Sequence, residues 1–504
     1  MKDEPKELQE LRHRLGEIRD LHRASAVLSW DQQTYMPPGG AVARAEQLAT
    51  LQRTAHVWFI SDEIGQLLEA LRAPAAEWDY DSDEASLVRV TLRDYEKARR
   101  IPPALVAELA RASTLAYEAW TKAKAAADFA IFLPHLEKIV DLNIQIAEAL
   151  GYQDRLYDAL LDQYEPDMKT AQVATLFENL KAELVPLVKT IASQTRLGND
   201  AILRRPMDIQ KQWDFGLAIL RDMGFDFNRG RQDKSVHPFT TAFSIDDVRL
   251  TTRLDPNYFP TALFGTIHEG GHGLYEQGLA KTLERTGLDD GASLGIHESQ
   301  SRLWENLIGR SQAFWYHYFP RLQQMFPEQM GDVDFEDFYQ AINAVKPTFI
   351  RVEADEVTYN LHIMIRFELE NDMLERRVHI RELPEAWNAK MEEYLGIVPP
   401  NDALGVLQDV HWSGGMLGYF PTYSLGNLYS VQFFDQAKRD ISGLADQIAT
   451  GHFSELLDWL RQNIHRHGRK YTPAELVARV TGNELTAKNY IDYIKQKFGE
   501  LYAL

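Results

Sequence analysis

Apolar residues recur along most of this chain at the three- and four-residue steps that place them on one side of an α-helix. Near the start, one such stripe consists of Leu8, Leu11, Leu15, Ile18 and Leu21. Similar stripes run through residues 136–150 and 357–369. Helix is therefore predicted to be the main element of the fold.

Residues 237–253 break this pattern. They are rich in Thr, Phe and β-branched residues, and Phe239, Thr241 and Phe243 alternate as in a short strand or hairpin. We therefore predict a mostly α protein with one small β-sheet.

Composition and charge exclude several classes of partner. With 54 Lys and Arg against 74 Asp and Glu, the chain has a formal net charge of −20, and it has no clustered basic block. Such a chain repels nucleic acid and anionic lipid. No run approaches the roughly 18 apolar residues that span a membrane, and the charged N-terminus lacks the apolar stretch of a secretory signal. We expect a cytoplasmic protein without nucleic-acid or membrane partners.

The sharpest motif is His268-Glu269-Gly270-Gly271-His272, an HExxH with apolar residues at helical spacing on both sides. On a helix, residues i and i+4 lie on one face, so both imidazoles can reach one Zn²⁺. Since the chain has no Cys, a metal site must use His, Asp and Glu. Each glycine costs up to about 1 kcal/mol in a helix interior, which indicates that a substrate or a neighbouring backbone approaches closely here.

A catalytic zinc site needs a third protein ligand and leaves one position to water. Glu298 is the candidate, in a segment that would open a second helix after a Gly-rich loop. An acidic residue in a first helical turn is also ordinary complementarity to the helix dipole. His297 is an alternative ligand from the same segment, and spacing alone does not separate the two residues.

Five further strings accompany the HExxH. They are HPF at 237–239, DVRLT at 247–251, HESQ at 297–300, IRVEAD at 350–355 and GVLQDVHW at 405–412. In this order, the set resembles the carboxypeptidase Taq family of thermostable zinc metallocarboxypeptidases, which are HExxH gluzincins. The resemblance covers most of the second half of the chain.

The resemblance implies a neurolysin-like helical fold with a deep groove. It implies a homodimer that binds one Zn²⁺ per subunit, with Co²⁺ as a substitute. The implied metal ligands are His268, His272 and Glu298, with His297 in a supporting role.

The chain has no clean domain boundary, internal repeat or low-complexity tract. We therefore predict a single domain over residues 1–504. Residues 1–230 would be mainly helical scaffold and groove wall, and residues 231–504 would be the motif-bearing catalytic part.

Peptide hydrolysis assigns roles to further residues. Glu269 would take a proton as a zinc-bound water attacks the scissile carbonyl. The developing oxyanion needs a second electrophile, for which His411 and Tyr423 are candidates. The arrangement is similar to the His and later Tyr of gluzincin peptidyl dipeptidases. The alternatives are a core histidine bonded to Asp409 and a tyrosine that only packs.

An enzyme that removes C-terminal residues must bind a free α-carboxylate, and the planar fork of Arg is suited to this. Arg351 is the first choice, with Arg249 and Arg253 as runners-up. Pairing of any of these arginines with a nearby acid is the alternative interpretation. His237 either contacts the peptide backbone or shapes the turn before Pro238.

Together with these residues, the resemblance implies a metal-dependent carboxypeptidase that releases amino acids sequentially from peptides with a free C-terminus, with broad specificity. The first alternative is a zinc oligopeptidase or peptidyl dipeptidase with the same chemistry. The second is a catalytically inactive helical binding protein that retains a metal.

Overall fold

The structure is a computed structural model that describes residues 4–193 and 200–504. The chain folds into two compact units. Unit 1 comprises Met1–Arg99, Ala201–Ile342 and Phe433–Asn483, and unit 2 comprises Arg100–Asp200, Asn343–Gln432 and Glu484–Leu504. The predicted single domain, with its scaffold over 1–230 and its catalytic part over 231–504, stays a prediction.

Unit 1 is mainly helical. Its α-helices are α1 (Lys6–Thr34), α2 (Ala41–Phe59), α3 (Asp62–Ala76), α4 (Asp83–Arg100), α9 (Ile209–Met223), α10 (Phe259–Gly278), α11 (Leu294–Arg302), α12 (Gln312–Met325), α13 (Pro327–Met330), α14 (Phe335–Ile342), α18 (Leu444–Ala449), α19 (Ser454–Asn463) and α20 (Pro473–Thr481). One of its cores joins α1, α3 and α4, where Leu8, Leu11 and Leu15 of the predicted stripe are buried.

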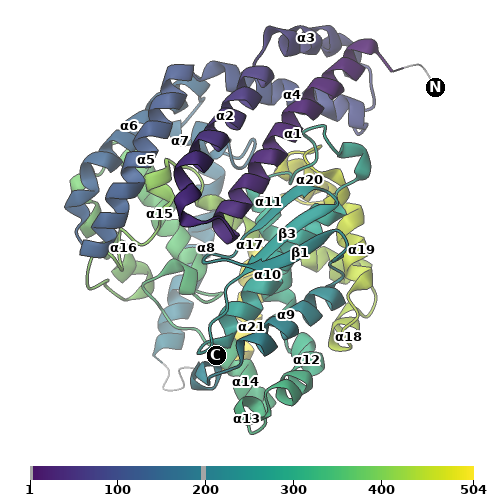
Figure 1. Ribbon diagram of the computed structural model, residues 1–504. Coiled ribbons are helices and arrows are strands. Elements are labelled where there is room, and N and C mark those ends of the chain that lie inside the picture. Colours follow the sequence, from purple (N-terminus) through teal and green to yellow (C-terminus); the bar gives the residue numbers. More distant parts are fainter. Residues whose placement is uncertain (1–3, 194–199) are drawn as a thin grey trace. The chain divides into compact units, whose positions relative to one another are not determined.

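The predicted small sheet is present in unit 1. It consists of β1 (Gly230–Lys234), β2 (Thr240–Ser244) and β3 (Asp247–Thr252), in the order β1-β3-β2. β3 pairs in parallel with β1 and antiparallel with β2, with Thr240 opposite Leu250. β3 and α10 lie side by side (Figure 1). The predicted hairpin is β2 and β3, whereas β1 lies outside the predicted range.

Unit 2 is also helical. Its α-helices are α5 (Pro103–Ala126), α6 (Leu133–Leu150), α7 (Leu156–Leu161), α8 (Thr170–Ala192), α15 (Tyr359–Leu374), α16 (Leu383–Leu395) and α21 (Lys488–Tyr502). α17 (Pro421–Asp440) begins in unit 2 and ends in unit 1.

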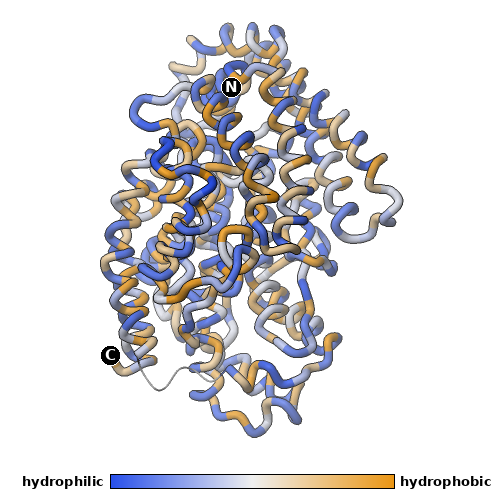
Figure 2. Tube along the Cα trace, turned by 90° about the vertical axis from the view of Figure 1, so that its left-hand side faces the viewer, coloured by the Kyte–Doolittle hydropathy of each residue, from blue (hydrophilic) through white to orange (hydrophobic). Residues whose placement is uncertain are grey.

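Helix α15 is the most deeply buried of the predicted helices. All of its residues except Glu368 and Asp372 are buried, so its solvent-facing side is limited to these two partly exposed residues one turn apart. In contrast, apolar and polar residues alternate along most other helices (Figure 2), as expected when one face packs on a core. Among the described residues, no helix is both long enough and apolar enough to cross a membrane.

Candidate metal centre and associated residues

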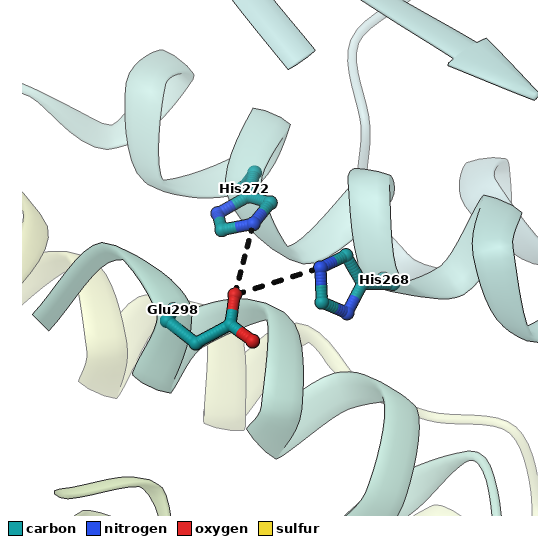
Figure 3. A group of neighbouring side chains, drawn as sticks. All are labelled: His268, His272 and Glu298. Carbon is teal, nitrogen blue, oxygen red and sulfur yellow. Dashed lines mark ion pairs between the residues drawn. The ribbon is translucent and has the colours of Figure 1, made fainter. Parts of the chain in front are cut away.

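Helices α10 and α11 bring together the three predicted ligands. His268 and His272 lie one turn apart on α10, and Glu298 lies on α11 (Figure 3). Gly271 allows the two helices to approach, because a Cβ on it would lie 2.6 Å from the carbonyl oxygen of Gln300 on α11. The close approach predicted from the glycines is therefore that of a neighbouring backbone.

The donor atoms of these three residues converge. Glu298 Oε2 lies 3.6 Å from His268 Nε2 and 3.5 Å from His272 Nε2, and all three donor atoms lie within 4.8 Å of one another. Bonds of about 2.1 Å around a tetrahedral zinc would place neighbouring donors about 3.4 Å apart. Two imidazoles and one carboxylate therefore fit a divalent metal ion and leave a further position open.

Hydrogen bonds orient both imidazoles from behind. His268 Nδ1 lies 2.9 Å from Glu305 Oε2, and His272 Nδ1 lies 2.6 Å from His297 Nδ1. His297 Nε2 in turn lies 3.0 Å from Glu276 Oε1. Partners of this kind fix the ring orientation and leave Nε2 available to a metal. His297 thus contacts His272 instead of joining the ligand group.

Glu305 comes from an unusual turn. Residues Leu303–Ile308 continue α11 as a π-helix, a rare geometry that is often found at functional sites. Arg302, the last residue of α11, donates to Glu298 Oε1 at 2.7 Å and to Glu305 Oε2 at 3.2 Å. One guanidinium therefore holds both the candidate ligand and the carboxylate behind His268.

The electrostatics of the centre favour an ionised carboxylate. Burial would raise the pKa of Glu298, but the charge of Arg302 and the neighbouring imidazoles hold it well below its usual value. Burial lowers the pKa of His272 to about 3, which keeps this imidazole neutral. An ionised carboxylate and a neutral imidazole are the protonation states in which these groups bind a metal.

Glu269 faces a different environment from the ligands. Its side chain is buried, and the Thr240 hydroxyl on β2 donates to Oε2 at 2.7 Å. Burial raises the pKa of Glu269 above its ordinary value. Among the described residues, Thr240 is the one hydrogen-bond donor to this desolvated carboxylate, which is therefore well suited to accept a proton.

We expect Glu305→Gln to weaken metal binding without changing the ligands. The neutral amide is a poorer acceptor for His268 Nδ1–H, and loss of such a partner costs about 10- to 100-fold in metal affinity. Competition with a chromophoric chelator measures the dissociation constant. Glu328→Gln, on the exposed surface of α13, is the matched control, and equal affinities for the two variants would contradict the orienting role of Glu305.

Arg351 lies in unit 2, in the turn before α15, and is buried. Its Nε and Nη2 donate to Asp409 Oδ1 at 3.1 and 2.9 Å, and Nη1 donates to the Tyr359 hydroxyl at 3.0 Å. Arg366 on α15 also donates to Asp409, at 2.6 Å. Asp409 therefore pairs with two buried guanidinium groups, and part of the Arg351 fork is already engaged.

His411 and Tyr423 also lie in unit 2 and contact each other. His411 Nε2 lies 3.2 Å from the Tyr423 hydroxyl, and both side chains are half-buried. His411 Nδ1 is 3.9 Å from Asp409, beyond hydrogen-bonding distance. Burial lowers the pKa of His411 to about 4, so the imidazole is neutral at pH 7.

The remaining predicted site residues lie in unit 1. On β3, Arg249 pairs with Asp247 through two hydrogen bonds, as the alternative interpretation proposed, and its guanidinium lies 5.1 Å from the Trp30 ring centroid. His237 is exposed in the turn between β1 and β2, where its carbonyl accepts from Ser235. Arg253, after β3, is also exposed.

Comparison with known proteins agrees with the metal centre. Residues 10–498 match the carboxypeptidase Taq (M32) metallopeptidase family. The chain belongs to this family. Thermostable carboxypeptidase 1 of Thermus thermophilus is 44% identical over 95% of both chains, and carboxypeptidase 1 of Bacillus subtilis is 40% identical over 97% of both. The M32 carboxypeptidase structure from Deinococcus radiodurans matches with a TM-score of 0.96 and 41% identity, over 99% of this chain and 100% of the other.

Membership in the M32 family confirms the resemblance seen in the sequence motifs. It also confirms that the chain is an enzyme, a metallocarboxypeptidase that acts on peptides and requires a metal ion. The predicted mostly helical fold with one small sheet is confirmed by the structure and by the M32 neighbours.

Several residues around the M32 metal centre were not predicted from the sequence. They are Thr240, Glu276, Arg302 and Glu305. Arg302 follows Glu298 by four residues on a predicted helix, so the ion pair between them could have been predicted from the sequence. The other three contacts join separate elements or depend on the π-helical turn.

Proposed function

We propose that this M32 carboxypeptidase releases single amino acids in sequence from the C-terminus of peptides, with broad side-chain specificity. One Zn²⁺ per subunit, replaceable by Co²⁺, would be bound by His268, His272 and Glu298. The observation that carries the proposal is the convergence of these three donor atoms within 4.8 Å, next to a buried Glu269. When bound, the ion supplies a polarised water and a Lewis acid for the scissile carbonyl.

Glu269 performs the proton transfer in this proposal. It accepts a proton from the attacking water and delivers it to the leaving amine, as general acid–base catalysis requires. The Thr240 hydroxyl donates to one carboxylate oxygen, so the other oxygen is available to the water. Burial favours the protonated form of Glu269, which helps the carboxylate to take up the proton.

His411 and Tyr423 stabilise the oxyanion. Hydrogen-bond donors aimed at a developing negative charge contribute about 2.7–4 kcal/mol each. The neutral state of His411 supports this role, because a neutral imidazole and a tyrosine hydroxyl each carry one hydrogen to donate. Their mutual contact keeps the two groups together, and the hydrogen shared between them would have to turn to the oxyanion.

Substrate binding is proposed for three residues. Arg351 binds the terminal carboxylate, while Arg249 and His237 contact the rest of the peptide. Two of the five N–H donors of Arg351 remain after its bonds to Asp409 and Tyr359. We further propose that the enzyme is a cytoplasmic homodimer built from one domain per chain.

Timed product analysis before and after chelation tests the proposed function. On a peptide of mixed sequence, the loaded enzyme should release single residues in C-terminal order. A chelator should abolish release, and added Zn²⁺ or Co²⁺ should restore it. Dipeptides or internal fragments would instead support the oligopeptidase alternative, and a metal-loaded sample without hydrolysis would support the inactive binding protein.

A further inference from the structure

Two buried charges of opposite sign lie one turn apart on α15. Arg366 and Glu370 are both fully buried, and their i, i+4 spacing places them on one face of the helix. Buried charges are tolerated in proteins only when they are paired and hydrogen-bonded. Each of the two side chains has hydrogen-bond partners in the segment from Gln408 to Gly418, which carries His411.

Arg366 holds the start of this segment. Its Nε donates to Asp409 Oδ2 at 2.6 Å, and its Nη2 donates to Gln408 Oε1 at 2.7 Å. Asp409 is two residues before His411, so this contact fixes the backbone on one side of the imidazole.

Glu370 holds the part of the segment that follows His411. Its carboxylate accepts from Trp412 Nε1 at 2.9 Å, from the backbone N–H of Gly418 at 3.0 Å and from the Tyr157 hydroxyl at 2.7 Å. Gly418 has φ +90°, and a Cβ on it would lie 2.7 Å from the carbonyl carbon of Leu160. The turn at Gly418 is therefore pressed against Leu160, and Glu370 satisfies the N–H that faces inward.

His411 depends on these anchors because its own ring makes few polar contacts. Nε2 contacts the Tyr423 hydroxyl, whereas Nδ1 has no hydrogen-bond partner within the parts of the chain that the structure describes. The imidazole otherwise packs on the rings of Phe420 and Tyr419, with centroids 4.5 and 5.3 Å away. With so few polar contacts, its position depends on the backbone between Asp409 and Trp412 together with this packing.

The same carboxylate contributes to the charge balance when it is ionised. Asp409 alone cannot neutralise Arg351 and Arg366, and an uncompensated buried charge is strongly destabilising. An ionised Glu370 brings the group of four side chains to neutrality. Burial raises the pKa of Glu370 to about 7, although its three hydrogen bonds and Arg366 favour the ionised form.

We propose that Glu370 is a positioning residue for His411: by holding Trp412 and Gly418, its carboxylate sets the place of the imidazole. The proposal rests on the proposed role of His411 in the reaction. It assigns a function to a side chain that lies outside the recognised motifs.

Glu370→Gln tests the proposal while keeping the shape of the side chain. The amide turns an NH₂ group toward one of three donors, so at least one contact is lost. Because a misplacement of about 1 Å can cost roughly 100-fold in rate, we expect kcat to fall about 10- to 100-fold. KM and metal content should change less than about twofold. Glu165→Gln is the matched control, because Glu165 is also fully buried and accepts from a tyrosine hydroxyl, that of Tyr429.

A double-mutant cycle with His411→Ala separates positioning from general damage. If Glu370 acts through His411, Glu370→Gln should have little further effect on kcat in the His411→Ala background. An equal loss in both backgrounds, or no loss in either, would overturn the proposal. Full activity of His411→Ala alone would instead refute the role of His411 in the proposed function, and the Glu370 proposal would fall with it.

Trp412→Phe is the second variant, should Glu370→Gln not fold. It removes one donor but leaves the carboxylate and its bonds to Tyr157 and Gly418. We expect the same loss of kcat, and the same absence of a further effect in the His411→Ala background. Tyr157→Phe, which removes the donor outside the segment, should leave kcat within about threefold of the original chain.

Discussion

Glu269→Gln is expected to reduce peptide hydrolysis by about 10²–10⁴-fold, the contribution of a positioned general acid–base residue. The amide can still accept from the Thr240 hydroxyl, but it cannot take a proton from water. The residue is not among the three that could hold the metal, so metal content should stay the same. Initial rates on a chromogenic peptide and metal analysis of the same samples measure both effects.

The fold of Glu269→Gln should remain intact. The carboxylate is buried, and burial disfavours its charged form, so a neutral amide of the same shape is no worse in this environment. Glu328→Gln removes the same charge from the exposed surface of α13 and should hydrolyse peptides at the original rate. A near-native rate for Glu269→Gln would remove Glu269 as the base.

The pairing of His268 and His272 could be predicted because both lie on one helix. Helical geometry alone places residues four apart on one face, and the structure confirms the helix over Phe259–Gly278. A close approach of a substrate or a backbone at these glycines could also be inferred, since glycines are costly in a helix interior unless they make room; the structure shows a backbone at Gly271. Glu298 needed the family pattern, because the loop between the two helices could place either His297 or Glu298 toward the metal.

Contacts between distant elements could not be predicted in the same way. Asp409 is 58 residues from Arg351, and nothing in the local pattern marks it in preference to Asp355. In the structure Asp355 instead accepts from the backbone of Lys346 and Thr358. Glu305 escaped prediction because the π-helical turn changes the residue spacing that a regular helix would have.

Periodicity also fails where a helix is buried on most of its surface. Only the apolar residues of α15 stand out in its sequence, whereas the structure buries Arg366 and Glu370 as well. Charged residues in such a helix would be assigned to a solvent face by pattern alone. β1 was missed for a related reason, because its sequence, Gly230–Lys234, has no alternating apolar residues.

Arg351→Ala is expected to weaken the binding of peptides with a free C-terminus by about 10- to 150-fold. This corresponds to the loss of a charge-assisted hydrogen bond worth about 1.5–3 kcal/mol, at 1.4 kcal/mol for each factor of ten. Matched inhibitor peptides, one with a free acid and one with a C-terminal amide, measure the effect as two inhibition constants. The amide should bind the original enzyme and Arg351→Ala about equally, because it lacks the carboxylate to which Arg351 donates.

The variant should fold because Asp409 keeps a partner. Arg366 donates to Asp409 Oδ2 at 2.6 Å and is fully buried beside it. Removal of Arg351 therefore does not leave this buried carboxylate alone, the situation that makes a broken ion pair so destabilising. Arg351→Lys keeps the charge but loses the planar fork. Its affinity for the free acid should therefore lie between that of the original enzyme and that of Arg351→Ala.

Arg249→Ala is the matched comparison for Arg351→Ala. Arg249 is the runner-up, and its fork is occupied by Asp247 on the same strand, so its removal should affect the acid and the amide to the same degree. Arg249 would bind the terminal carboxylate instead if Arg249→Ala weakened the binding of the free acid alone while Arg351→Ala weakened the binding of acid and amide equally. Equal losses in both variants would mean that neither arginine distinguishes a terminal carboxylate from an amide.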